Sequence, residues 1–343
     1  MPAMLELNYD YASCVTSSEK ISWKLDDVMP PDARLDFGQP FLPSALAARG
    51  SLTFLRPDES RALNQITGNA YLNLFAFVEE YILATMIQHA QAEVFGDHQA
   101  IRALSRFVDE EVKHQQLFYR YLAAFRRDFG HDVEVLSSAA EVAGIILGKS
   151  PIAVMLITYH IEIMTQAHYT ECVKDDAAID PFFSKLLRFH WLEESQYARI
   201  DALELDKLLR DATTAQIETG LSDYIDLIGA FDGMLRQQAE MDARSLARCT
   251  GRVFDEASVK AIVDAQHAGY RYTFLVYGMK NASFINVYAP CRRMPSDVSP
   301  IGLLACRDRH ERPCTSKAHE RARPREGHGA RHRRTAQGWA HVD

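Results

Sequence analysis

Ionisable side chains fall on the apolar faces of four consecutive amphipathic segments, where an unpaired carboxylate is costly to bury. Each segment carries one glutamate with apolar helical neighbours, and two of the segments add a histidine. The six candidate metal ligands are Glu79, Glu111, His114, Glu162, His190 and Glu194. Four carboxylates and two imidazoles would balance the charge of two divalent cations, and this donor set suits iron or manganese better than zinc or calcium. The pattern therefore predicts a buried site for two metal ions.

The set as a whole is more informative than any single member. A glutamate on a helix is usually solvated, and the Glu-x-x-His spacing of Glu111 and His114 often arises by chance. Four inward carboxylates with no inward Lys or Arg on the same stripes are harder to explain without cations. His160 and His168 flank Glu162 but point away from its stripe. We expect these two histidines to pack or to hydrogen-bond to ligating carboxylates.

Six helices are expected to position these residues. Asp58 and Asp97 precede the first two as candidate N-caps, while Ser-Pro at 150 and Asp-Pro at 180 combine a capping residue with a proline at the first helical position. Apolar residues then recur every three to four positions. The expected helices cover about residues 59–94, 97–129, 150–174, 180–209, 212–248 and 255–278.

The connections between these helices indicate how they are arranged. Short connections join the first helix to the second and the third to the fourth, so each pair should form an antiparallel hairpin. Residues 130–149 are long enough to cross over between the hairpins, which is the layout of a ferritin-like four-helix bundle. The expected fold is therefore all-α, with additional C-terminal helices after the bundle core. We divide the chain into an irregular N-terminal arm (1–56), a helical domain with the metal site (57–288) and a tail (289–343).

The tail has an abruptly different composition. It holds 12 Lys and Arg against 6 Asp and Glu, is rich in His, Pro and Cys, and lacks apolar periodicity. Such a segment cannot bury enough apolar surface to offset its chain entropy, so we expect it to be disordered and basic. An out-of-frame translation of a GC-rich gene end would have the same composition. A metal-binding tail is an alternative, although its five His and three Cys match no ligand spacing.

Several classes of protein are disfavoured by composition. Residues 1–288 hold 26 Lys and Arg against 40 Asp and Glu, and they show no basic stripe that would bind nucleic-acid phosphates. The N-terminus lacks the features of a secretory signal, and no uncharged apolar run is long enough to span a membrane. None of the six cysteines forms a CxxC pair. We therefore expect a cytoplasmic protein with free thiols that binds neither nucleic acid nor membrane.

At this point the ordered ligand set resembles the ferritin-like di-iron carboxylate proteins. The closer resemblance is to the p-aminobenzoate N-oxygenase family, bacterial di-iron oxygenases of amino-aromatic compounds. It covers about residues 60–280 and rests on the motif FVEEYI at 77–82 with Glu79, on Glu111-x-x-His114, on Glu162, and on the fourth helix. There the family has His-x-x-x-Glu-x-x-His, of which His190 and Glu194 match the first two members.

Tyr197 stands where this resemblance places a last histidine, so two metals would share six protein ligands instead of seven. His190, Glu194 and Tyr197 fall at i, i+4 and i+7 on one helical stripe, which Asp201 continues. Three interpretations of Tyr197 remain open. It packs in the core with its hydroxyl bonded to a neighbour such as Asp201, it ligates iron(III) as a phenolate, or it is a redox-active tyrosine beside the cluster.

The resemblance implies O₂-dependent oxidation, by oxygenation, of a small organic substrate such as an amine or aromatic amine. The cofactor would be two Fe ions, or Mn with Fe, in a non-haem site. No flavin or nicotinamide fingerprint is present, so an external reductase or ferredoxin would supply electrons. The alternative is a metal-binding or iron-handling bundle without substrate chemistry. The apolar row on helix 212–248 is either core or the seam of a homodimer.

Overall fold

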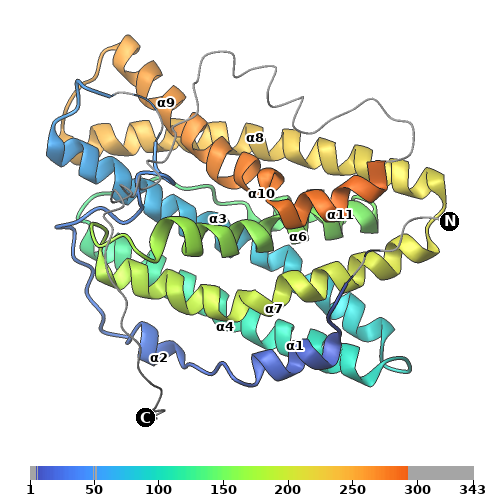
Figure 1. Ribbon diagram of the computed structural model, residues 1–343. Helices are drawn as coiled ribbons and strands as arrows, with labels where there is room; N and C mark the ends of the chain where they lie inside the picture. Colours follow the sequence, from blue (N-terminus) through green and yellow to red (C-terminus); the bar gives the residue numbers. More distant parts are fainter. Residues whose placement is uncertain (1–4, 6, 49, 51, 293–343) are drawn as a thin grey trace, which may run out of the picture.

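The chain is folded almost entirely into helices. The computed structural model describes residues 5, 7–48, 50 and 52–292, and within these residues every regular element is helical (Figure 1). The four helices predicted to form the bundle core are α3 (Pro57–Ala92), α4 (His98–Asp128), α6 (Pro151–Ala167) and α7 (Pro181–Asp211). A π-helical segment, η1 (His168–Val173), extends α6. The all-α prediction is confirmed.

The core helices form the two predicted hairpins. Helix α3 packs along α4, and α6 packs along α7. The connection between the hairpins contains α5 (Ala139–Leu147), which lies against α3. Two hairpins joined by a crossover make the ferritin-like arrangement that the connection lengths predicted. All four core helices can therefore direct one stripe toward a common interior.

The N-terminal caps of these helices largely follow the sequence signals. The Asp97 carboxylate accepts a hydrogen bond from the Gln99 backbone N–H at 2.7 Å, and Asp180 accepts one from Phe183 at 2.7 Å. The predicted cap at Asp58 is wrong, because Pro57 already occupies the first helical turn and Arg56 is the N-cap. Proline fixes the backbone dihedral that a first helical residue needs, so the helix begins at Pro57, two residues earlier than predicted.

Helix α3 is apolar on nearly every side. By length and composition it could cross a membrane, but 78% of its most apolar window is buried inside the structure. The longest uncharged run in this helix, residues 62–78, is bounded by Arg61 and Glu79. Its neighbours α4, α5 and α8 cover it, which is how a core helix of a bundle reaches this composition.

The N-terminal arm is not wholly irregular, as the sequence had suggested. It contains α1 (Tyr11–Ser18) and α2 (Leu25–Val28), and α1 packs against α4 and α7. A reciprocal pair of hydrogen bonds between Asp10 and Ser13 caps α1. The side chains of Tyr11, Cys14 and Val15 form the buried face of this helix. The helix is too short to show a clear apolar period, so its contacts with the bundle stabilise it.

The C-terminal helices cover the opposite side of the bundle (Figure 1). Helix α8 (Thr214–Thr250) packs on α3 and α6, and its apolar row is buried within the chain. That row is therefore core. Next come α9 (Glu256–Tyr270), the π-helical segment η2 (Arg271–Val276), α10 (Tyr277–Lys280) and α11 (Ala282–Arg292). The sequence did not predict α11, and the predicted tail beyond it lies outside the described residues.

Candidate metal centre

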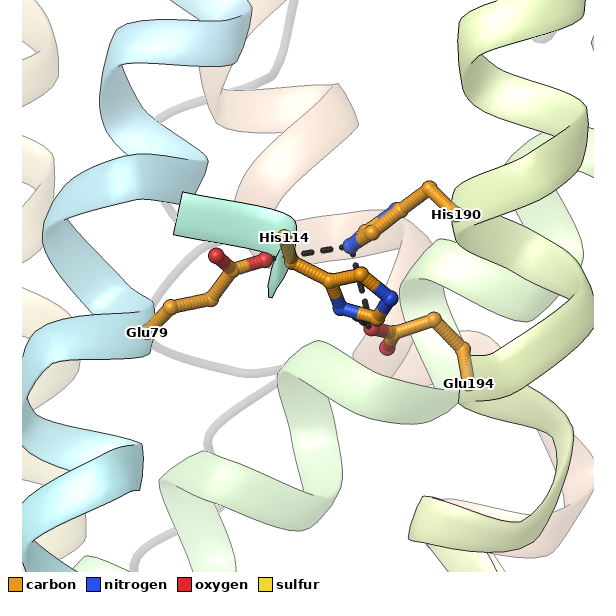
Figure 2. A group of neighbouring side chains, drawn as sticks. All are labelled: Glu79, His114, His190 and Glu194. Carbon is orange, nitrogen blue, oxygen red and sulfur yellow. Dashed lines mark hydrogen bonds and ion pairs between the residues drawn. The ribbon is translucent and has the colours of Figure 1, made fainter. Parts of the chain in front are cut away.

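The structure brings all six predicted ligands together between the four core helices. They form two groups, and within each group the potential ligand atoms lie within 4.8 Å of one another. The first group is Glu79, His114, His190 and Glu194 (Figure 2). The second is Glu111, Glu162 and Glu194. Glu194 belongs to both groups, so its carboxylate lies between two adjacent candidate metal positions.

The first group is tied together through the imidazole of His190. Its Nε2 lies 3.1 Å from Glu79 Oε1 and 3.0 Å from Glu194 Oε1 (Figure 2). His114 Nδ1 lies 3.3 Å from the same Glu194 oxygen. The rings of Phe75 and Phe118 pack edge-on against His190. Helices α3, α4 and α7 thus direct donor atoms into one small volume with an aromatic wall.

The second group leaves strong acceptors without partners. Both carboxylate oxygens of Glu111 are buried without a hydrogen bond in the described structure, as is Oε2 of Glu162. In the first group, Glu79 Oε2 also lacks a hydrogen bond. Buried acceptors are normally satisfied, because an unpaired carboxylate oxygen costs its full desolvation energy. The unsatisfied atoms are of the types that ligate iron and manganese, so the residues present fit a pair of such ions.

Without cations, the site distributes its charge unevenly. Burial raises the pKa of Glu111 and Glu162 well above the usual value, and neighbouring carboxylates add to that rise. Burial also acts to raise the pKa of Glu194, but the two imidazoles outweigh it and hold that pKa below its usual value. Burial acts to lower the pKa of His114, yet hydrogen bonds to Glu193 and Glu194 raise it. Metal ions bound here would displace these protons.

The structure adds a residue that the sequence interpretation missed. Glu193 is 1% exposed, its Oε2 lies 2.9 Å from His114 Nε2, and its other oxygen accepts a hydrogen bond from Lys113. This contact fixes the ring of His114 so that Nδ1 faces the cluster, a common role for a carboxylate behind a metal-binding histidine. Trp23, from the N-terminal arm, stacks on the outer face of the same ring.

No periodicity signal could have found this support. Glu193 precedes Glu194 and is rotated about 100° from it, so it falls off the ligand stripe. Its burial depends on α4 and on the arm that carries Trp23. Lys113 of α4 pairs with Glu193 and not with any of the four candidate ligand carboxylates, and its side chain is 23% exposed.

Tyr197 is buried beside the cluster, but its hydroxyl is directed elsewhere. It donates a hydrogen bond to Glu110 Oε2 at 2.8 Å, and its ring stacks on Phe107. The partner is therefore Glu110 and not Asp201, which the sequence had suggested. Burial raises the pKa of Tyr197 well above its usual value, so a neutral phenol is favoured. The geometry supports core packing over a phenolate ligand.

We expect Tyr197→Phe to leave metal content and the optical spectrum of the oxidised iron form unchanged. It removes one buried hydrogen bond, which should cost about 1 kcal/mol of unfolding free energy. Tyr224→Phe is a matched control, because Tyr224 is also buried and bonds to His160 at 2.8 Å. A visible absorption band lost only in Tyr197→Phe would show that the phenol ligates iron.

Three other histidines of the helical domain, His89, His160 and His168, make contacts outside the cluster. His168 bonds to the Tyr71 hydroxyl at 2.8 Å and to the Thr273 carbonyl at 3.1 Å. Burial lowers the pKa of His168 to about 3 and that of His160 to about 4, so both are neutral packing residues. His89, which lies off the Glu79 stripe, pairs with Glu204 at 2.7 Å.

Comparisons with known proteins give only a weak likeness. No protein-family model matches the chain, and no curated protein matches it. Among solved structures, it is similar to an R2-like ligand-binding oxidase with an aerobically reconstituted Mn/Fe cofactor, at 14% identity over 81% of this chain and 94% of that chain, with a TM-score of 0.46. A mutant of an R2-like ligand-binding oxidase with an Fe/Fe cofactor matches at 14% identity over 78% and 94%, with a TM-score of 0.44. These values assign no family, so the interpretation of the site rests on its own residues.

Proposed function

We propose that this protein is a non-haem di-metal oxidoreductase that uses O₂ to oxidise a small organic substrate. The observation that supports this most directly is the pair of buried groups that share Glu194 and contain unsatisfied carboxylate oxygens. In a bundle with a purely structural role, buried carboxylate oxygens without partners would only destabilise the folded state. Bound cations would remove that cost. Two adjacent positions of this kind suit a pair of redox-active ions better than one structural ion.

The six ligands would hold two Fe ions, or Mn with Fe. Such a pair supplies O₂ binding and electron transfer when it is bound. The chain supplies the rest of the site. Glu193 orients His114, and the aromatic rings beside His190 exclude water. Both oxygens of Glu111 and Oε2 of Glu162 have no hydrogen bond in the described structure, so these atoms are available to ligate metal ions.

The finer assignment is an oxygenase of amines or aromatic amines, as in the p-aminobenzoate N-oxygenase family. The six candidate ligands in the order of that family support this assignment. The family's seventh ligand, a histidine, is replaced here by Tyr197, whose hydroxyl is directed toward Glu110. An external reductase or ferredoxin would deliver electrons to the cytoplasmic protein. O₂ and a small molecule would be its substrates.

Iron handling without substrate chemistry is the second candidate. Its support is the burial of the cluster, whose six residues are all 2% exposed or less. Two cavities of about 610 and 700 Å³ are lined by other residues. A substrate would therefore need a path that opens between helices, whereas iron and O₂ are small enough for transient openings.

Aerobic turnover distinguishes the two candidates. Iron-loaded protein is reduced, freed of excess reductant, mixed with oxygen-isotope-labelled O₂ and incubated with small aromatic amines or with analogues that lack the amine. We expect labelled oxygen in an amine product, and no product with metal-free protein. Consumption of O₂ with ferric iron as the only product, across the substrate panel, would instead identify an iron-handling bundle.

A further inference from the structure

Asp201 is a buried acid that the metal site does not use. It is 0% exposed, and within the described structure neither of its carboxylate oxygens has a hydrogen-bond partner. It lies seven residues after Glu194 on α7, which places it on the same face and about 10 Å further along the helix. It is therefore too far along α7 to join the cluster as a ligand. A buried polar group without partners calls for an explanation.

The next turn of α7 reaches the wall of a cavity. Glu204 follows Asp201 by about 4.5 Å along the helix, and it lines the cavity of about 700 Å³ together with His89, Lys207 and Ser150. Its Oε2 lies 2.7 Å from His89 Nδ1, and its Oε1 accepts hydrogen bonds from Tyr11 and Lys207. Exposed residues at the rim, Ala92 and Asp211 among them, give this cavity access to solvent.

We propose that Asp201 relays protons from this cavity to the metal centre, with the Glu204–His89 pair as its entrance. The proposal rests on the function proposed above, because reduction of O₂ takes up as many protons as external electrons. The electrons come from the external donor, and the relay moves protons only. Asp201 releases its carboxyl proton toward the cluster and takes another from the Glu204–His89 pair, which is recharged from solvent in the cavity.

The groups around Asp201 suit this role. Burial raises its pKa well above the usual value, and the charges of Glu194 and Glu204 add to the rise, so the acid is held with its proton. Charges on Glu111 and Glu162 also interact with Asp201, from α4 and α6. The phenols of Tyr81, Tyr159 and Tyr9 also interact with Asp201, and Arg199 of α7 lies over the ring of Tyr9. Arg199 donates no hydrogen bond to Asp201, because neither carboxylate oxygen has a partner in the described structure.

Tyr81 offers the connection between Asp201 and the cluster. It is 0% exposed, and its pKa is raised by burial and by the charges of Glu162 and Asp201. Its hydroxyl is buried without a hydrogen-bond partner in the described structure, so this group can accept one proton and donate another without a net change of charge. Buried water can complete such a chain where two to four polar groups surround it.

The first test uses the metal-free protein and infrared spectroscopy. Wild type should show a carbonyl stretching band of a protonated carboxylic acid that shifts in D₂O and is reduced in Asp201→Asn. Asp242→Asn is the matched control, because Asp242 is equally buried but accepts hydrogen bonds from Gln238, Gln266 and Tyr270. It lies 23 residues beyond Thr219 on α8, the last residue of that helix to line the cavity. An identical spectrum in wild type and Asp201→Asn would show that Asp201 is ionised and would overturn the relay.

The second test uses the iron-loaded, reduced protein mixed rapidly with O₂. Asp201→Asn should retain the wild-type metal content but slow the proton-dependent step about 100-fold, the lower range for a positioned proton donor. The solvent deuterium isotope effect should rise, Asp201→Glu should recover part of the rate, and Glu204→Gln should slow the same step. Wild-type rate and isotope effect in fully loaded Asp201→Asn would overturn the relay alone. Failure of the wild type to retain iron would overturn the proposed function. It would also remove the metal centre to which the relay is proposed to deliver protons.

Discussion

Glu194→Ala is expected to abolish stable metal binding, from about two ions per chain to well below one. The other five ligands each belong to one group, whereas Glu194 contributes to both, so its loss removes a donor from both metal positions together. Mutation of a residue that only hydrogen-bonds to a metal ligand already lowers metal affinity about 10- to 100-fold. Loss of a ligand that both metal positions share should lower it further. Metal content after iron loading and desalting measures the effect.

Glu80→Ala is the matched control for this variant. Glu80 follows the ligand Glu79 but is rotated outward, where it accepts a hydrogen bond from Tyr119 at 2.5 Å. It should keep the wild-type metal content. Circular dichroism should show unchanged helix content in both variants. Full metal content in Glu194→Ala would mean that the two groups do not share this carboxylate.

The second large effect is expected in the stability of the metal-free protein as a function of pH. Glu111 and Glu162 have folded pKa values well above the usual ones, and so does His114. Groups of this kind bind more protons in the folded state, so their stabilising contribution is complete at low pH and is lost as the pH rises through the folded pKa. The unfolding free energy should therefore fall from about pH 5 to about pH 8, by on the order of several kcal/mol.

The depressed pKa of Glu194 acts in the opposite sense, but its contribution is lost only as the pH falls below its ordinary value, outside this range. Metal binding should reverse the slope, because the ions displace these protons and bind more tightly as the pH rises. Denaturant titrations of metal-free and loaded protein at each pH make the comparison. A metal-free protein that grows more stable from about pH 5 to about pH 8 would contradict this charge distribution.

Two variants separate this charge effect from packing. Glu111→Gln removes a buried acid that neighbouring carboxylates disfavour in the ionised form, so at high pH it should stabilise the metal-free protein. Phe118→Ala removes a fully buried ring that contacts His190, and it should cost about 3–5 kcal/mol at every pH. Equal destabilisation by both variants would indicate that Glu111 is held by packing.

The sequence predicted the core of the fold, and it singled out the six candidate ligands that the structure brings together, for one physical reason. Long helices repeat their contacts with a fixed period, so an acid such as Glu162 stands out within an apolar stripe, and Pro or Asp at a helix start marks the register. The hairpins then follow from connection length. These signals are local, and a single sequence contains them in full.

The parts that escaped prediction depend on contacts between distant segments. Helix α1 is stabilised by α4 and α7, and Glu193 is buried because Lys113 and Trp23 surround it. The Tyr197 hydroxyl could have bonded to Asp201 on its own helix or to an acid on another helix. The packing of α4 against α7 places Glu110 within reach instead. None of these contacts can be recognised from the spacing of residues in the sequence. Each depends on how close two helices lie and not on a residue's position within one helix.

The central claim is tested most directly by elemental analysis of the wild-type protein. The chain is expressed with iron, or loaded with ferrous iron under anaerobic conditions, and then freed of loosely bound metal. The account predicts about two transition-metal ions per chain, as expected for two positions that share a carboxylate. Well below one ion per chain after complete loading would contradict it, and the buried acids would then require another explanation.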